Sequence, residues 1–95
     1  GDLNFCSTWD ENQALRDNYV DLWPLLHVDP GFTLVPREPS TTWPAVRFDR
    51  ILVKSPPGAL KAKEIRLIGT SPLDPARPTL YPSDHFGLRT ELRLT

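Results

Sequence analysis

The stretch Tyr81–Thr95, YPSDHFGLRTELRLT, joins a polar turn to the clearest strand pattern in the chain. Successive side chains of a β-strand point to opposite faces of its sheet, so a half-buried strand alternates apolar and polar residues. We therefore predict a strand over residues 86–95, preceded by the turn PSDH. One face of this strand would carry Leu88, Thr90, Leu92 and Leu94, and the other Gly87, Arg89, Glu91 and Arg93.

Two further runs have the composition of strands, residues 45–53 (AVRFDRILV) and 62–70 (AKEIRLIGT). In the first run, alternation would place Arg47 and Asp49 on one face and Arg50 on the other. Most of the 11 prolines lie in the loops between the regular runs. Proline donates no hydrogen bond to a strand ladder and interrupts helices, so these loops separate the predicted elements.

Residues 8–26 (TWDENQALRDNYVDLWPLL) have the pattern of a helical segment. Acidic residues near its start suit a helix N-terminus, and Val20, Trp23 and Leu26 recur at roughly helical spacing. We expect one or two short helices, with Pro24 in the first turn of the second helix or at a break.

Together these elements predict an α/β (α+β) unit with one mainly antiparallel sheet and one or two short helices. A single helical layer would leave one face of the sheet uncovered, so we expect half of a layered fold. The 95 residues allow one domain at most. The chain has no Met and begins within a predicted element, from which we expect a longer parent protein.

The composition indicates a cellular compartment but does not indicate a function. A net charge of -1 gives no electrostatic argument for a nucleic-acid partner and does not exclude one. The single cysteine, Cys6, cannot form a disulfide within the chain, which favours a reducing, intracellular compartment, either nuclear or cytoplasmic. No apolar run reaches the length that spans a bilayer, so no membrane partner is expected.

Three short stretches could carry chemistry, and each has a structural alternative. In GDLN, strand alternation would bring Asp2 and Asn4 to one face, although a turn is favoured on these four residues alone. In PSDH, Asp84 beside His85 suits proton transfer, and the alternative is an Asx turn with an exposed histidine. Asp49 needs a partner if it is buried in a strand, either an arginine of its own or an adjacent strand, or His85.

Four other side chains have simpler interpretations. Trp43 lies in a proline-rich polar loop and could be an aromatic platform for a base or a peptide. Trp9 and Trp23 are predicted to be core or helix-packing residues. His27 has no second ligand at metal spacing and is predicted to end a helix.

Taken together and in this order, GDLN, RFDRI and PSDHFGL resemble the endonuclease/exonuclease/phosphatase superfamily of metal-dependent phosphoesterases. Within it they are most similar to the 5′-tyrosyl-DNA phosphodiesterase branch, with NYVDLW at residues 18–23, TTW at 41–43, RFDRI at 47–51 and PSDHFGL at 82–88. Cys6 stands where that branch has an arginine, which bears on the substrate and not on the reaction class. The resemblance implies that residues 1–95 are the C-terminal half of a four-layer α/β sandwich whose upstream half is absent.

The resemblance also implies a catalytic role for each matched residue. Asp2 would position or deprotonate the attacking water, and Asn4 would hold water and phosphate. Asp49 would orient His85, and His85 would bind the scissile phosphate and stabilise charge on it. Asp84 would lie at the metal, directly or through water.

The implied protein is a phosphodiesterase that uses Mg²⁺ or Mn²⁺ to release tyrosine from DNA 5′ ends, in DNA repair. Trp43 and Phe48 would then line the DNA groove near the cleaved bond. Because the metal-binding glutamate of the family would lie upstream of Gly1, the isolated chain is expected to be inactive or nearly so. Two alternatives stay open: a superfamily member that acts on RNA, abasic DNA or a phospholipid headgroup, and a non-catalytic interaction module that has kept the motifs.

Overall fold

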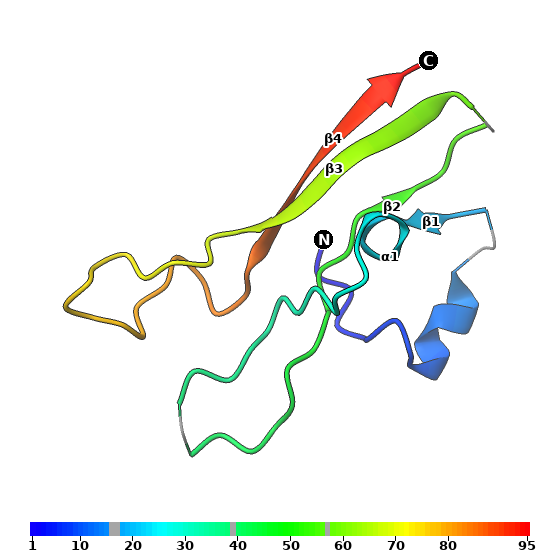
Figure 1. The fold of residues 1–95 in the computed structure, drawn as a ribbon. Coiled ribbons are helices and arrows are strands. Elements are labelled where there is room, and N and C mark those ends of the chain that lie inside the picture. The colour runs from blue at the N-terminus through cyan, green and yellow to red at the C-terminus, as the bar shows by residue number, and fades with distance from the viewer. Residues whose placement is uncertain (16–17, 39, 57) are drawn as a thin grey trace.

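The structure is a computed structural model that describes residues 1–15, 18–38, 40–56 and 58–95. Within these ranges the chain is a small mixed α/β structure with two antiparallel two-stranded sheets and two short helices. The elements, in chain order, are the 3₁₀ helix η1 (Asp10–Ala14), β1 (Val20–Asp21), α1 (Leu22–Leu26), β2 (Leu52–Val53), β3 (Leu60–Ile68) and β4 (Gly87–Leu94) (Figure 1). The predicted mixture of short helices and antiparallel strands is therefore confirmed.

The longer sheet consists of β3 and β4, which pair from Leu60↔Leu94 to Ile68↔Gly87 with an irregularity between Ala62 and Glu64. Both strands lie within two residues of the predicted runs because their alternation is a local signal. Figure 1 shows the pair as a long twisted ribbon, with the loop over residues 69–86 extending from one end. That loop returns the chain through the turn that carries His85.

The core lies between α1 and β3. Leu22 and Trp23 of the helix are buried against Ile65 of the strand. His27 follows the helix, stacks on Trp23 with ring centroids 4.2 Å apart, and donates from Nε2 to the Ile65 carbonyl at 2.6 Å. Trp23 is therefore a core residue and His27 a helix-end residue, as predicted.

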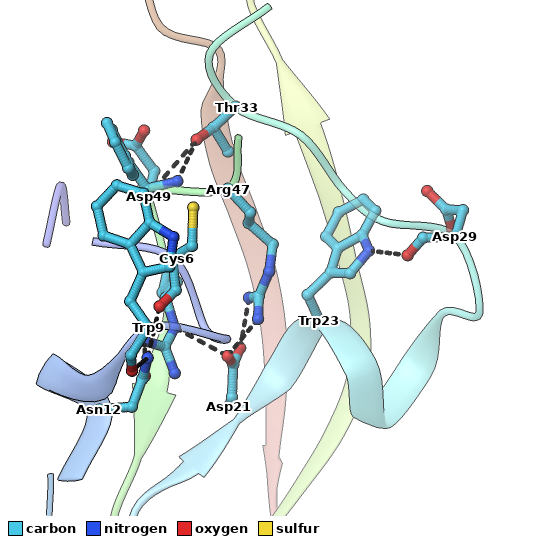
Figure 2. A network of polar contacts seen from close by, with 11 residues as sticks. Cys6, Trp9, Asn12, Asp21, Trp23, Asp29, Thr33, Arg47 and Asp49 are labelled. Atoms are coloured by element: carbon cyan, nitrogen blue, oxygen red, sulfur yellow. Dashed lines mark hydrogen bonds and ion pairs between the residues drawn. The ribbon is translucent and has the colours of Figure 1, made fainter. Parts of the chain in front are cut away.

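The loop after α1 closes over the Trp23 ring. Trp23 Nε1 donates to the Asp29 carbonyl at 2.9 Å (Figure 2), and Gly31 approaches the indole so closely that a Cβ there would lie 2.2 Å from a ring atom. Gly31 also has a φ of 64°, in the left-handed region that glycine adopts without a steric penalty. The core thus anchors the loop that leads to Thr33.

The prediction of one or two short helices within residues 8–26 is confirmed, but the helical placement of Val20 is wrong. The two ends of this segment form η1 and α1, with Pro24 in the first turn of α1, but Val20 belongs to β1 and pairs with Val53. Valine is β-branched and suits a strand, and Val20 is exposed rather than part of an apolar helix face. Arg16 and Asp17 lie outside the described residues.

The predicted strand over residues 45–53 is also corrected, because only Leu52–Val53 forms a regular ladder. Upstream of it, Val46 and Asp49 make single bridges with Leu34 and Asp2. Consequently the one predicted sheet is replaced, in the described residues, by two separate two-stranded sheets, with isolated bridges outside their strands. Arg47 and Arg50, which regular alternation would place on opposite faces, both donate to the Asp21 carboxylate.

None of the helices in the described ranges is long and apolar enough to cross a membrane.

Candidate active site

Three segments far apart in the sequence bring Asp2, Asp49 and His85 together. The N-terminal segment runs antiparallel to residues 48–50, with a bridge between Asp2 and Asp49 and with the Leu3 N–H donating to the Phe48 carbonyl at 2.8 Å. On the other side, His85 forms a bridge with Leu34. The backbone pairing therefore positions the main-chain atoms from which the three side chains extend.

The side chains form one compact cluster. His85 Nδ1 donates to Asp49 Oδ2 at 2.6 Å, and His85 Nε2 lies 4.0 Å from Asp2 Oδ2. One ligand atom from each of the three residues lies within 4.8 Å of the others. The predicted contact between Asp49 and His85 is confirmed, and the alternative of an arginine partner for Asp49 is wrong.

The cluster is open to solvent on the Asp2 side. The side chains of His85 and Asp49 are 21% and 18% exposed, whereas the Asp2 side chain is 40% exposed. Nε2 is therefore the ring nitrogen of His85 that is left for a ligand or a substrate. An imidazole held at one nitrogen and free at the other can donate or accept a proton at a fixed position.

The surroundings of His85 favour its charged form. The hydrogen bond to Asp49 raises the pKa of His85 above its usual 6.5, burial acts in the opposite direction, and the negative charges of Asp49, Asp2 and Asp84 raise it further. A cationic imidazole with an exposed N–H suits the binding of an anion such as a phosphate.

Thr33 positions Asp49, and sequence reasoning missed it. The Thr33 side chain is fully buried, and its hydroxyl oxygen accepts hydrogen bonds from the backbone N–H groups of Phe48 and Asp49 at 3.1 and 3.0 Å (Figure 2). Its carbonyl accepts the Phe86 N–H at 2.6 Å. One threonine therefore ties the Asp49 segment to the His85 segment, and no local pattern in the sequence marks it.

A buried ion-pair network lies beside the cluster. Arg47 donates to both carboxylate oxygens of Asp21, at 2.8 and 2.6 Å, and Arg50 Nε donates to the same carboxylate at 2.9 Å. Arg50 also donates to the Asn12 side chain at 2.6 Å. Figure 2 shows Arg47 reaching across to Asp21 at the start of α1. Because both arginines that flank Asp49 are bound here, the Asp49 carboxylate is left for His85.

The Asp21 carboxylate is held in its charged form. Burial raises the pKa of Asp21, but the hydrogen bonds and charges of Arg47 and Arg50 outweigh burial and lower it below its usual 3.8. Three N–H groups of the two arginines bind this carboxylate, which has about four acceptor sites. We therefore assign Asp21 to the fold rather than to the chemistry.

The strand-alternation argument for Asn4 is wrong. Asn4 has a φ of 58° and its N–H donates to Asp2 Oδ1 at 2.8 Å, which is an Asx turn and the structural alternative for GDLN. The hydrogen bonds of the described residues include none from the Asn4 side chain. Its proposed contact with water and phosphate stays a prediction.

Asp84 is exposed and lies outside the group formed by Asp2, Asp49 and His85. Its carboxylate accepts a hydrogen bond from the Ser83 hydroxyl at 3.3 Å. The predicted alternative, an Asx turn with an exposed histidine, is wrong: the His85 N–H donates to the Ser83 hydroxyl and not to an Asp84 oxygen, and the His85 side chain is half-buried and bonded to Asp49. The metal role of Asp84 stays a prediction.

An apolar hollow adjoins the cluster. Phe48 lies beside His85, with ring centroids 6.5 Å apart, and Trp9 meets Phe48 edge to face at 5.6 Å. Trp9 and Trp43 are 44% and 45% exposed, so the prediction of Trp9 as a core residue is wrong. The reason is that η1 buries no residue and leaves Trp9 on the surface. The hollow is lined by Trp9, Leu34, Trp43, Pro44, Val46 and Phe48.

The donor set fits a divalent cation without selecting one. Two carboxylates and an imidazole within 4.8 Å of one another are ligands that several divalent metals accept. The hydrogen bond between His85 Nδ1 and Asp49 Oδ2 already uses these two atoms, so a metal ion would have to bind the other donor atoms or replace this bond. The oxygen ligands of this group are the carboxylates of Asp2 and Asp49.

Comparisons of the chain with protein-family models, with curated proteins and with solved structures found no match. What the chain does is therefore argued from its motifs and from the geometry of this cluster.

Proposed function

We propose that the chain belongs to a divalent-metal-dependent phosphodiesterase, and that this enzyme removes tyrosine from DNA 5′ ends in DNA repair. The observation that carries the proposal is the hydrogen bond from His85 Nδ1 to Asp49, with Asp2 beside the other ring nitrogen. Asp49 orients the ring and favours its charged form, and Asp2 supplies a carboxylate on the solvent side.

The arrangement suits an in-line displacement at phosphorus. His85 Nε2 donates its hydrogen bond to a non-bridging phosphate oxygen and stabilises the charge that grows there. Asp2 takes the proton of the attacking water and holds that water opposite the tyrosine oxygen, so that a new P–O bond forms as the bond from phosphorus to the tyrosine oxygen breaks and tyrosine leaves. Asn4 assists in holding water and phosphate. Nothing in this assignment requires movement of Asp49, which keeps the imidazole in one orientation.

A bound Mg²⁺ or Mn²⁺ would add positive charge at the phosphate oxygens and polarise the bond that breaks. Asp84 would hold the ion directly or through water, with an oxygen of Asp2 as a second ligand. These two carboxylates leave most of an octahedral shell to water, to substrate and to residues outside the chain.

The apolar hollow supports a nucleic-acid substrate. Phe48 lies beside His85, and Trp43 lines the same hollow as Phe48; bases or a tyrosine ring can stack on such aromatic side chains. Stacking does not depend on net positive charge, which agrees with a formal charge of -1. An intracellular location, nuclear or cytoplasmic, follows from such a substrate.

We further propose that residues 1–95 form the C-terminal half of a four-layer α/β sandwich. The uncovered apolar side chains of β4 support this: Leu88 is partly buried, whereas Leu94 on the same strand face is 81% exposed. The upstream half would cover this surface and supply the remaining metal ligands. Accordingly, the isolated chain should be inactive or nearly so.

The test is an assay of tyrosine release from a 5′-tyrosyl oligonucleotide by the product of the complete reading frame, with Mg²⁺ or Mn²⁺. We expect release that stops with a chelator, and no turnover by residues 1–95 alone. An RNA, an abasic-site DNA and a phospholipid headgroup, assayed in parallel, identify the other enzymes of the class. Failure to hydrolyse any of the four with either metal contradicts the proposal and favours the non-catalytic interaction module.

A further inference from the structure

Arg37 reaches from the loop after Thr33 to the turn that carries Asp84 and His85. Arg37 Nη1 donates to the Ser83 carbonyl at 2.9 Å, and Nη2 donates to the Asp84 carbonyl at 3.2 Å. Both acceptors are main-chain atoms. The guanidinium group therefore binds the backbone of the turn and not the Asp84 carboxylate.

Two aromatic rings hold the guanidinium group in this place. Arg37 Cζ lies 3.9 Å from the centroid of the Tyr81 ring and 5.3 Å from that of Phe86. These rings stand at the two ends of the turn, with their own centroids 6.0 Å apart. A planar guanidinium group can stack on a ring while its N–H groups form a fork of hydrogen bonds, which lysine cannot do.

The contact of Arg37 has a cost that its other bonds offset. Arg37 Nε is buried and has no hydrogen-bond partner among the described residues. An unpaired buried donor is unfavourable. The two carbonyl bonds and the ring contacts outweigh this cost, so the orientation of the guanidinium group is determined by the turn.

Little else attaches the middle of the turn to the rest of the molecule. Ser83 and Asp84 are exposed, belong to no helix or strand, and otherwise bond to each other and to the His85 N–H. In the described part of the chain, Arg37 makes the side-chain contacts that join their backbone to another segment. From His85 onward the backbone is held separately, by the bridge with Leu34 and by the bond from the Phe86 N–H to the Thr33 carbonyl, so Arg37 secures the side of His85 that precedes it in the chain.

We propose that Arg37 is a positioning residue for His85: by holding the Ser83–Asp84 backbone, it keeps the imidazole in register with Asp49. Its importance for catalysis rests on the function proposed above, whereas the positioning itself can be measured without any activity. No catalytic contact is assigned to Arg37.

The test compares Arg37→Met, Arg37→Lys and the control Arg77→Met in the chain itself. Methionine keeps much of the length and the apolar contact but has no donors, and Arg77 is an exposed arginine of the neighbouring loop. The readouts are the NMR resonance of the His85 Nδ1 proton in its bond to Asp49, and the hydrogen exchange of the His85 and Phe86 amides.

For Arg37→Met we expect the Nδ1 proton signal to broaden or disappear, and the two amides to exchange about tenfold faster or more, the scale of one or two lost hydrogen bonds to a charged donor. Arg37→Lys should fall between Arg37→Met and the wild type, and Arg77→Met should match the wild type. General destabilisation alone would leave the Nδ1 signal of the folded molecules in place.

A wild-type Nδ1 signal and wild-type exchange in folded Arg37→Met would overturn the proposal. If Arg37→Met does not fold, the result for Arg37→Lys decides. A broadened Nδ1 resonance and faster amide exchange in Arg37→Lys support the proposal, and wild-type values of both overturn it. In the active full-length protein, Arg37→Met should lower kcat about tenfold and leave KM nearly unchanged. An inactive full-length wild type would contradict the proposed function, while the NMR result would still decide the role of Arg37.

Discussion

At the scale of single residues, the site depends on one hydrogen bond whose two partners lie 36 positions apart in the sequence, that between His85 Nδ1 and Asp49. The bond orients the ring and raises the pKa of His85. A group whose folded pKa is raised stabilises the fold fully below its unfolded pKa and loses this contribution as the pH rises through the folded pKa. The charged imidazole and the native fold therefore support each other at neutral and mildly acidic pH.

The first prediction is that Asp49→Asn lowers the pKa of His85 towards its usual 6.5, because the negative acceptor is lost. The measurement is an NMR titration of the His85 ring protons in the wild type and the variant. Asp29→Asn, which removes an exposed carboxylate from the loop after α1, serves as the control and should leave the His85 titration as it is. An unchanged His85 pKa in Asp49→Asn would show that the bond does not govern the charge of the ring.

The second prediction concerns the apolar hollow. Trp43→Ala should weaken the binding of a single-stranded oligonucleotide by about 1–3 kcal/mol, the range for one base stacked on an aromatic ring. Fluorescence anisotropy of a labelled oligonucleotide with the full-length protein measures the affinity. Leu73→Ala, at an exposed apolar residue of the distal loop, is the control and should bind like the wild type. Equal affinities for the Trp43 and Leu73 variants would remove Trp43 from the substrate path.

At the scale of elements, the segments around the site are joined by side chains more than by strand ladders. Residues 46–50 make only single bridges, and Asp21 holds this segment to the start of α1 through Arg47 and Arg50. Removing one partner of a buried ion pair leaves an uncompensated charge, which costs far more than the pair contributes. The network should therefore govern the stability of this part of the fold.

The third prediction is that Asp21→Asn lowers the free energy of unfolding by about 3 kcal/mol at neutral pH, because two buried guanidinium groups lose their counter-charge. A lowered carboxyl pKa stabilises the fold above the unfolded value of 3.8, and this contribution disappears as the pH falls through the folded pKa. Urea unfolding at several pH values should thus show a difference in the free energy of unfolding between wild type and variant, and this difference should become smaller in acid.

The control is Glu64→Gln, which removes a half-exposed carboxylate 3.8 Å from Arg66. Exposed pairs contribute little, so its effect should stay below about 1 kcal/mol. A loss of unfolding free energy for Asp21→Asn as small as that for Glu64→Gln, or one that does not decrease in acid, would contradict the role given to the network.

The fourth prediction is that Gly31→Ala destabilises the fold by about 2–4 kcal/mol, from overpacking against Trp23 and from a left-handed backbone. Gly58→Ala is a matched control, since Gly58 has a φ of 79° but has no atom within 4 Å of an added Cβ. It should cost only about 1 kcal/mol. Equal losses for the two variants in urea unfolding would show that contact with Trp23 contributes nothing.

At the scale of the whole molecule, alternation in the sequence predicted the long strands, but it did not predict the hydrogen bonds between remote loops. The strands β3 and β4 followed from alternation, and the contact between Asp49 and His85 was expected from motifs that resemble a known family. The contributions of Thr33 and Arg37 could not be predicted, because hydrogen bonds between remote loops leave no periodic trace. Trp9 was predicted to be a core or helix-packing residue because its type favours burial, but it is 44% exposed at the start of η1, a helix with no buried residue.

Apolar side chains remain exposed at the outer surface of the molecule. The described residues extend over 47 × 30 × 20 Å, and apolar side chains such as Leu25 and Leu94 remain exposed along α1 and β4. In the described residues α1 packs on Ile65 of β3, and we propose that the upstream half covers the remaining apolar side chains. The catalytic assay should therefore use the protein encoded by the complete reading frame.

The most direct test of the central claim is the turnover of a 5′-tyrosyl oligonucleotide by full-length His85→Ala and His27→Ala, each scaled to its folded fraction. Because the His85 imidazole would stabilise charge in the transition state, its loss should reduce kcat about a hundredfold or more with little change in KM. His27 stacks on Trp23 and bonds to Ile65, so His27→Ala should lower Tm and keep the turnover of the folded molecules. Near-normal turnover by folded His85→Ala would contradict the account and reduce PSDH to a turn.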